Sequence, residues 1–145
     1  MTFVLRQAVR EDIPGMHHVR LAVRENRLRS LAIGEEDYIR EIEGTGRGWV
    51  IEVYGQVVAF AIGNVTTGNI WALFVDPEHE ARGYGRLLHD EMVGWLFGRG
   101  LSRLDLGTAP GTRAQRFYEA AGWRYAGLNQ NGEAMYELTS HNDKL

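Results

Sequence analysis

The chain has 145 residues, of which 44% are hydrophobic and 24% are charged, with a formal net charge of −3 and no cysteine. This composition is ordinary for a globular domain and excludes a disordered chain. The missing cysteines exclude disulfides, cysteine-ligated metals and a cysteine nucleophile. The acidic charge argues against a nucleic-acid partner, and no apolar run is long enough to suggest a membrane partner.

The start of the sequence shows no secretory signal pattern. Together with the absence of cysteine, this leads us to expect a cytoplasmic location. We expect one domain over residues 1–140 and a frayed polar tail over residues 141–145.

Hydrophobic periodicity predicts the secondary-structure elements. In chain order we expect a strand at Phe3–Val9, a helix from Arg10, a short helix from Glu35 to about Ile42, strands at Trp49–Tyr54, Val57–Val65 and Ile70–Val75, a helix from Gly83 to about Phe97, a strand at Leu101–Leu106, a helix capped by Thr112, and strands at Trp123–Gly127 and Ala134–Thr139. This order predicts an α/β (α+β) fold with a mixed central sheet of about six to seven strands flanked by about four helices.

Two local features refine these expectations. Gly55-Gln56 is expected to form a two-residue hairpin turn. The run Ile70–Val75 (IWALFV) is nearly all apolar, which predicts a strand covered on both faces.

The most informative stretch is Leu73–Leu88, with the sequence LFVDPEHEARGYGRLL. It predicts a strand that ends in a glycine-bearing loop before an amphipathic helix. Free N–H groups at a helix N-terminus bind anions, and glycines let the backbone approach a phosphate closely. Arg82 and Arg86 add positive charge. The pattern predicts a loop that binds a diphosphate. The alternative is a tight turn without a ligand. The spacing is not that of a P-loop or of a dinucleotide-binding fingerprint.

Two segments carry a family resemblance. Glu80–Gly85 (EARGYG) resembles the acetyl-CoA signature [QR]-x-x-G-x-[GA] of the GNAT N-acetyltransferases, and Ala114–Trp123 (AQRFYEAAGW) resembles their A-x-x-F-Y-x-x-x-G-[FW] segment. The expected element order is also similar to that of the family, so the resemblance covers nearly the whole chain. It implies a GNAT-like fold and an acetyl-CoA-dependent N-acetyltransferase that transfers the acetyl group directly to a primary amine in a ternary complex.

The resemblance also implies cofactor-binding residues. The main chain that binds the acetyl carbonyl and the pantetheine arm corresponds to Leu73, Phe74 and Val75. The loop that wraps the CoA pyrophosphate corresponds to Ala81, Arg82, Gly83, Tyr84, Gly85 and Arg86. Val75 N–H is the expected donor to the oxyanion.

Tyr118 matches the tyrosine that protonates the departing thiolate in this family. Its position on an apolar helix face is also typical of a core residue. Two positions depart from the family pattern. Glu80 replaces the usual Gln or Arg, and we expect its side chain to point away from the pyrophosphate. Gly111 replaces an Asn that contacts the pantetheine arm in many members, so that contact is expected to be lost or replaced.

The sequence defines the acceptor side less well. Glu25 is a candidate general base and Glu52 is another, although both are also typical of solvated surface residues. Trp71 is interpreted as a core residue, with a place in the acceptor pocket as the alternative. Four arginines follow one another in this part of the chain, namely Arg20, Arg24, Arg27 and Arg29. We interpret them as a solvated basic face. The alternative is that they attract an acidic acceptor or the 3′-phosphate of CoA.

We expect a small-molecule amine as the acceptor, because the domain is compact and weakly acidic. No histidines show metal-ligand spacing, so no metal is expected. A homodimer is one expectation, because open sheet edges are often paired. A catalytically silent acyl-CoA sensor and a purely structural domain are the rival hypotheses.

Overall fold

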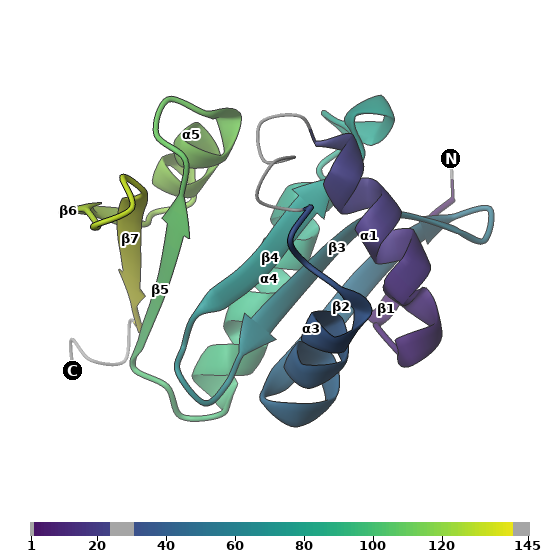
Figure 1. The fold of residues 1–145 in the computed structure, drawn as a ribbon, viewed down its shortest axis with the longest axis horizontal. Coiled ribbons are helices and arrows are strands. Elements are labelled where there is room, and N and C mark those ends of the chain that lie inside the picture. Colours follow the sequence, from purple (N-terminus) through teal and green to yellow (C-terminus); the bar gives the residue numbers. More distant parts are fainter. Residues whose placement is uncertain (1, 24–30, 141–145) are drawn as a thin grey trace.

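The computed structural model describes residues 2–23 and 31–140, which form seven strands and four α-helices in the predicted order (Figure 1). The strands are β1 (Val4–Gln7), β2 (Gly46–Val53), β3 (Gln56–Asn64), β4 (Ile70–Val75), β5 (Arg103–Thr108), β6 (Arg124–Leu128) and β7 (Ala134–Thr139). The helices are α1 (Ile13–Ala22), α3 (Glu35–Ile39), α4 (Tyr84–Gly98) and α5 (Arg113–Ala120), with 3-10 turns η1 (Arg10–Asp12) and η4 (Pro77–His79) and a π-helical turn η3 (Arg40–Gly44). The predicted tail over residues 141–145 lies outside the described residues.

The α/β class is confirmed, and the strands are divided into two antiparallel sheets. Their orders are β1-β2-β3-β4 and β5-β7-β6. Within the described chain, a single parallel bridge between Asn69 and Asp105 joins the two sheets. Asn69 Nδ2 donates to Asp105 Oδ1 over 2.8 Å at this point. From there β4 and β5 diverge toward their C-terminal ends (Figure 1).

Helices cover both faces of the first sheet, with α1 and α3 on one face and α4 on the other (Figure 1). β3 lies between these layers. Its side chains Phe60 and Ile62 pack in the cluster that includes α1 and α3, whereas Ala59 and Ala61 pack in the cluster that includes α4. β3 is therefore buried on both faces.

Ile70–Val75 packs against the layers on both faces, as predicted, but the cover is incomplete. Four of the six residues of β4 are only half-buried, namely Trp71, Leu73, Phe74 and Val75. The reason is that β4 borders the split between the sheets and does not pair with β5 along its length. Its apolar side chains are thus available to a ligand.

A β-bulge changes the direction of one of these side chains. In the pairing of β4 with β3, Ala72 lies opposite Ile62 and Ile70 lies opposite Gly63, which leaves Trp71 as the extra residue. A bulge of this kind re-aims a side chain. Trp71 accordingly packs with Ala72 against the cluster on the α1 side of the sheet.

The hairpin turn between β2 and β3 lies one residue earlier than predicted. Its central residues are Tyr54 and Gly55, with φ values of 52° and 78°, and the flanking pair is Val53 and Gln56. A type I′ turn requires positive φ at both central residues, and glycine takes the second position without strain. Thr112 caps α5 as predicted, because its side chain accepts a hydrogen bond from Gln115 N–H.

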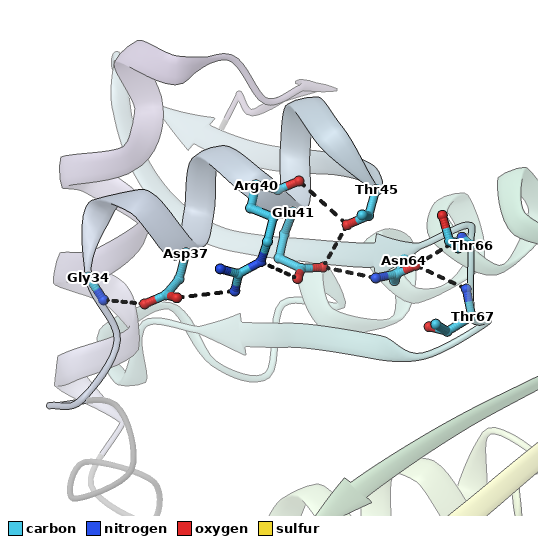
Figure 2. Close-up of polar contacts among 8 residues, drawn as sticks. All are labelled: Gly34, Asp37, Arg40, Glu41, Thr45, Asn64, Thr66 and Thr67. Atoms are coloured by element: carbon cyan, nitrogen blue, oxygen red, sulfur yellow. Dashed lines mark hydrogen bonds and ion pairs between the residues drawn. The ribbon is translucent and has the colours of Figure 1, made fainter.

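A buried carboxylate anchors the segment that leads into β2. Glu41 accepts hydrogen bonds from Thr45 Oγ1 and Asn64 Nδ2, both over 3.3 Å (Figure 2). Arg40 Nε contacts the other oxygen of Glu41 over 3.4 Å. Because a buried charge is costly unless it is paired, these contacts hold η3 against the end of β3. No helix within residues 2–23 and 31–140 has the length and apolarity needed to cross a bilayer.

Candidate active site

A cleft of about 880 Å³ occupies the split between the two sheets. β4 lines one side, and β5 with α5 lines the other. The end of α1 and the loop between η4 and α4 also contribute lining residues. A crevice at the carboxyl ends of diverging strands is where open α/β sheets commonly bind ligands.

The open edge of β4 presents backbone groups to this cleft. Asp76 N–H donates to Val58 C=O over 2.8 Å, so the backbone groups of Asp76 point toward β3. Backbone direction alternates along a strand. The N–H and C=O groups of Leu73 and Val75 therefore point away from β3 toward the split, where an extended ligand can pair with them.

The predicted anion-binding loop ends at the N-terminus of α4. Gly83 is the N-cap residue of α4 and has φ 82°, a left-handed conformation that glycine adopts without strain. Ala81 also has a left-handed backbone conformation, with φ 62°. This conformation is unfavourable for a residue with a Cβ. The first N–H groups of α4 have no partner within the helix and carry the positive end of its dipole. This end of the cleft is thus suited to an anion.

Gly85 allows the first turn of α4 to lie close to β4 and α5. A Cβ at this position would lie 3.5 Å from Val75 Cγ2 and 3.5 Å from Phe117 Cε1. Those are ordinary contact distances, so the site has room for a methyl group. This explains in physical terms why the signature accepts glycine or alanine here.

Eight of the nine predicted cofactor-binding residues line the cleft: Leu73, Phe74, Val75, Ala81, Gly83, Tyr84, Gly85 and Arg86. Arg82 and Gly111 are not among the lining residues. Arg86 pairs with Asp90 one turn further along α4, at 3.1 Å. Gly111 N–H donates to Gln115 Oε1 over 2.7 Å.

Glu80, which departs from the family signature, has an ion-pair partner that the sequence did not suggest. It is one of the lining residues, and its Oε2 pairs with Arg113 Nη1 at the start of α5 over 2.5 Å. The carboxylate is therefore held by a cation that also lines the cleft. Sequence reasoning missed this partner because it lies 33 residues away.

Tyr118 lines the cleft and is also packed in the core. It is 6% exposed, and its ring lies edge-on to Phe117 and Trp123 at centroid distances of 5.4 and 5.6 Å. Burial raises the pKa of Tyr118, so its hydroxyl stays protonated and can donate. Within the described chain the hydroxyl has no hydrogen-bond partner, yet it is not among the enclosed unpaired atoms. Its oxygen is accordingly open to the cleft.

A hydrogen bond between two buried side chains holds the end of α5 against α4. Trp123 Nε1 donates to His89 Nε2 over 2.9 Å, and His89 Nδ1 lies 2.9 Å from Asp90 Oδ1. Burial lowers the pKa of His89, which favours the neutral ring that this arrangement needs. This contact is absent from the sequence-based interpretation, which considered the histidines only as metal ligands and rejected them in that role.

The structure changes the list of candidate bases. Glu25 lies outside the described residues. Glu52 does not line the cleft, and its Oε2 pairs with Arg6 Nη2 at 2.9 Å, so the structure gives no support to Glu52 as the base. In the described chain the lining residues do include His79 and Glu133, neither of which sequence reasoning singled out.

Arg20 is the other residue whose interpretation changes. It is 6% exposed and lines the cleft, so a solvated position is wrong for this arginine. Arg24, Arg27 and Arg29 lie outside the described residues. The sequence contained a sign that Arg20 is buried, because it follows the buried Met16 by one turn of the same helix. Trp71 also lines the cleft, beside Arg20.

Fold and cleft together define an α/β protein suited to an elongated ligand with an anionic group, held between an open strand edge and a helix N-terminus. The acetyltransferase (GNAT) family model matches residues 16–123, and the chain belongs to this family. No curated protein sequence gives a match.

Several solved structures share the fold. The PaiA N-acetyltransferase of Thermoplasma acidophilum, solved in complex with coenzyme A, has a TM-score of 0.82 and 13% identity, with 97% of this chain and 100% of that chain covered. A GNAT-family acetyltransferase of Staphylococcus aureus Mu50 has a TM-score of 0.80 and 16% identity, with 95% and 99% covered. The ribosomal-protein-S18-alanine N-acetyltransferase of Escherichia coli has a TM-score of 0.73 and 19% identity, with 97% and 98% covered.

Proposed function

We propose that this protein is an acetyl-CoA-dependent N-acetyltransferase that transfers the acetyl group directly to the primary amine of a small molecule. The observation that carries the proposal is the cleft itself, with an open backbone edge at Leu73 and Val75 on one side and the left-handed loop at the N-terminus of α4 at its end. The coenzyme A in the Thermoplasma acidophilum structure supports the same choice of ligand.

The lining residues fit such a co-substrate. The N–H groups of Tyr84, Gly85 and Arg86 would hold the diphosphate, with the Arg86 side chain adding charge. Leu73 and Val75 would pair with the amide groups of the pantetheine arm as a neighbouring strand does. Acetyl-CoA supplies a thioester, which is an activated acyl group.

The chemistry then needs few protein groups. Val75 N–H donates to the acetyl oxygen while that oxygen gains negative charge. Tyr118 gives its proton to the sulfur as the carbon–sulfur bond breaks and the amine nitrogen bonds to the carbonyl carbon. The amine loses its extra proton to water, and Tyr118 regains a proton from solvent. Holding both substrates in one cleft supplies much of the remaining acceleration.

The proposal is tested by titrating the purified protein with acetyl-CoA in a calorimeter, with NADH and ATP as controls. We expect micromolar binding of acetyl-CoA alone. Turnover is then followed with a thiol reagent while a panel of amines is added. The chain has no cysteine, so every thiol detected is released CoA. Binding without amine-dependent thiol release would favour the sensor hypothesis, and no binding at all would favour the structural one.

The Glu80–Arg113 ion pair gives a second prediction for this site. Removing the cation with Arg113→Gln leaves a carboxylate on the cleft wall close to the diphosphate. We expect the affinity for acetyl-CoA to fall roughly tenfold through this repulsion, and the double variant Glu80→Gln/Arg113→Gln to regain most of it. Arg103→Gln is the matched control, because Arg103 also pairs with a carboxylate, Glu137, but does not line the cleft. Equal affinities in all variants would mean that the diphosphate lies elsewhere.

A further inference from the structure

Arg20 is a buried cation that forms no ion pair within the described part of the chain. Its Nε and Nη1 are enclosed and have no hydrogen-bond partner among the described residues. A guanidinium carries five N–H donors, and burying those on Nε and Nη1 without acceptors is costly. Burial of this arginine is therefore unfavourable unless a ligand supplies the missing hydrogen-bond acceptors.

The groups around Arg20 stabilise a positive charge through the faces of their rings. Its guanidinium carbon lies 4.5 Å from the ring centroid of Trp71, 5.0 Å from that of Phe74 and 5.7 Å from that of Tyr38. Cation–π contacts at these distances hold the side chain in place. The bulge at Trp71 brings the largest of these rings to this side of β4. The charge is thus oriented while the donors at Nε and Nη1 stay unused.

The titratable groups nearest to Arg20 do not neutralise it. Burial and the charge of Arg20 both lower the pKa of His17, which favours its neutral form. The carboxylate of Asp37 is engaged by Gly34 N–H at 2.8 Å and by Arg40 Nη2 at 3.1 Å. The positive charge of Arg20 is therefore available to an anion from outside the described chain.

Arg20 also lies next to the proposed point of transfer. Phe74, one of the rings below its guanidinium, stands between Leu73 and Val75, whose backbone groups face the cleft. The anion-binding loop lies at the start of α4, beyond the C-terminal end of β4. Arg20 belongs to α1 and lines the same cleft from the other side of this strand position, beside Trp71 and Phe74.

From these observations we infer that Arg20, held between Trp71 and Phe74, binds a carboxylate of the acceptor. The inference rests on the proposed function and narrows its substrate class to small amines that carry a carboxylate close to the amine, as amino acids do. Arginine suits this role because its planar fork matches the two oxygens of a carboxylate.

The test compares L-amino acids with the matching L-amino-acid amides, in which a neutral amide replaces the carboxylate. Because this also lowers the pKa of the α-amine, affinities and KM values are compared at matched concentrations of the neutral amine. Binding of each pair to the CoA-saturated protein is measured by calorimetry, and kcat and KM are measured with acetyl-CoA. For at least one amino acid we expect the wild-type protein to favour the carboxylate form by about 10- to 100-fold in affinity and in KM, the range for charged hydrogen bonds.

Arg20→Met should remove this preference, and Arg20→Lys should retain part of it. The matched control is Arg47→Met, because Arg47 also stacks on a ring, Trp95, at 4.7 Å but does not line the cleft. The affinity for CoA should be the same in Arg20→Met, Arg47→Met and the wild type.

Three results would overturn the inference. If the wild-type protein binds and acetylates the amides with the same affinity and KM as the acids, it has no carboxylate subsite. A preference that survives in Arg20→Met places the subsite elsewhere. A loss of CoA affinity in Arg20→Met would mean that Arg20 binds acetyl-CoA and not the acceptor. In each case neutral amines still release CoA, whereas failure of the proposed function itself would show as no acetyl-CoA binding or no thiol release with any amine.

Discussion

Gly83→Val is expected to lower the affinity for acetyl-CoA by about 100-fold or more, which corresponds to about 3 kcal/mol. Gly83 has φ 82° at the N-cap of α4, and a β-branched residue is a strong outlier in this conformation. A Cβ at Gly83 would meet no heavy atom within 4 Å. The loss would therefore come from the changed loop and from a side chain in the space before the helix, where the diphosphate is proposed to lie.

Gly55→Val is the matched control for this prediction. Gly55 has φ 78°, and a Cβ added there would also meet no heavy atom within 4 Å, but Gly55 belongs to the β2–β3 turn and does not line the cleft. We expect a similar loss of thermal stability in both variants, and a loss of affinity in Gly83→Val alone, measured by calorimetry. Normal binding by a folded Gly83→Val variant would show that the phosphate cradle has been misplaced.

Tyr118→Phe is expected to lower kcat by about 100-fold or less, because acid catalysis typically contributes 10²–10⁴ and water can replace part of it. The affinity for acetyl-CoA should be nearly unchanged. Phenylalanine keeps the ring contacts with Phe117 and Trp123. The substitution removes no hydrogen bond found in the described chain, so the fold should retain its stability.

The pH profile separates a catalytic role of Tyr118 from a structural one. Because burial raises its pKa above the usual value of about 10, ionisation of Tyr118 should cause no fall in wild-type kcat below pH 10. Tyr136→Phe is the control, since Tyr136 is fully buried and donates to Glu119 but does not line the cleft. That variant should lose about 1 kcal/mol of stability with kcat unchanged. A Tyr118→Phe variant with the wild-type rate across the pH range would refute the assignment.

The features that the sequence predicted well depend on residues a few positions apart. β4, β7 and the cap of α5 at Thr112 were placed correctly, because strand periodicity and capping are local. The loop before α4 was recognised from its glycines for the same reason, since left-handed φ and a free helix N-terminus are properties of that short stretch. Even the error at the β2–β3 turn was a shift of one residue between two positions with similar turn chemistry.

The tertiary structure alone decided the features that depend on distant pairing. β5 pairs with β7, so β4 keeps an open edge and its apolar side chains line a cleft. Glu80 gains its cation from α5, and Glu52 gains its partner from β1.

Arg20 shows the difference most clearly. The sequence contained its helical spacing, but only the packing of α1 against the bulged strand β4 determined that this arginine is buried beside Trp71. Local patterns are set by the energetics of neighbouring residues, whereas the burial of a charge depends on which surfaces meet once the chain has folded.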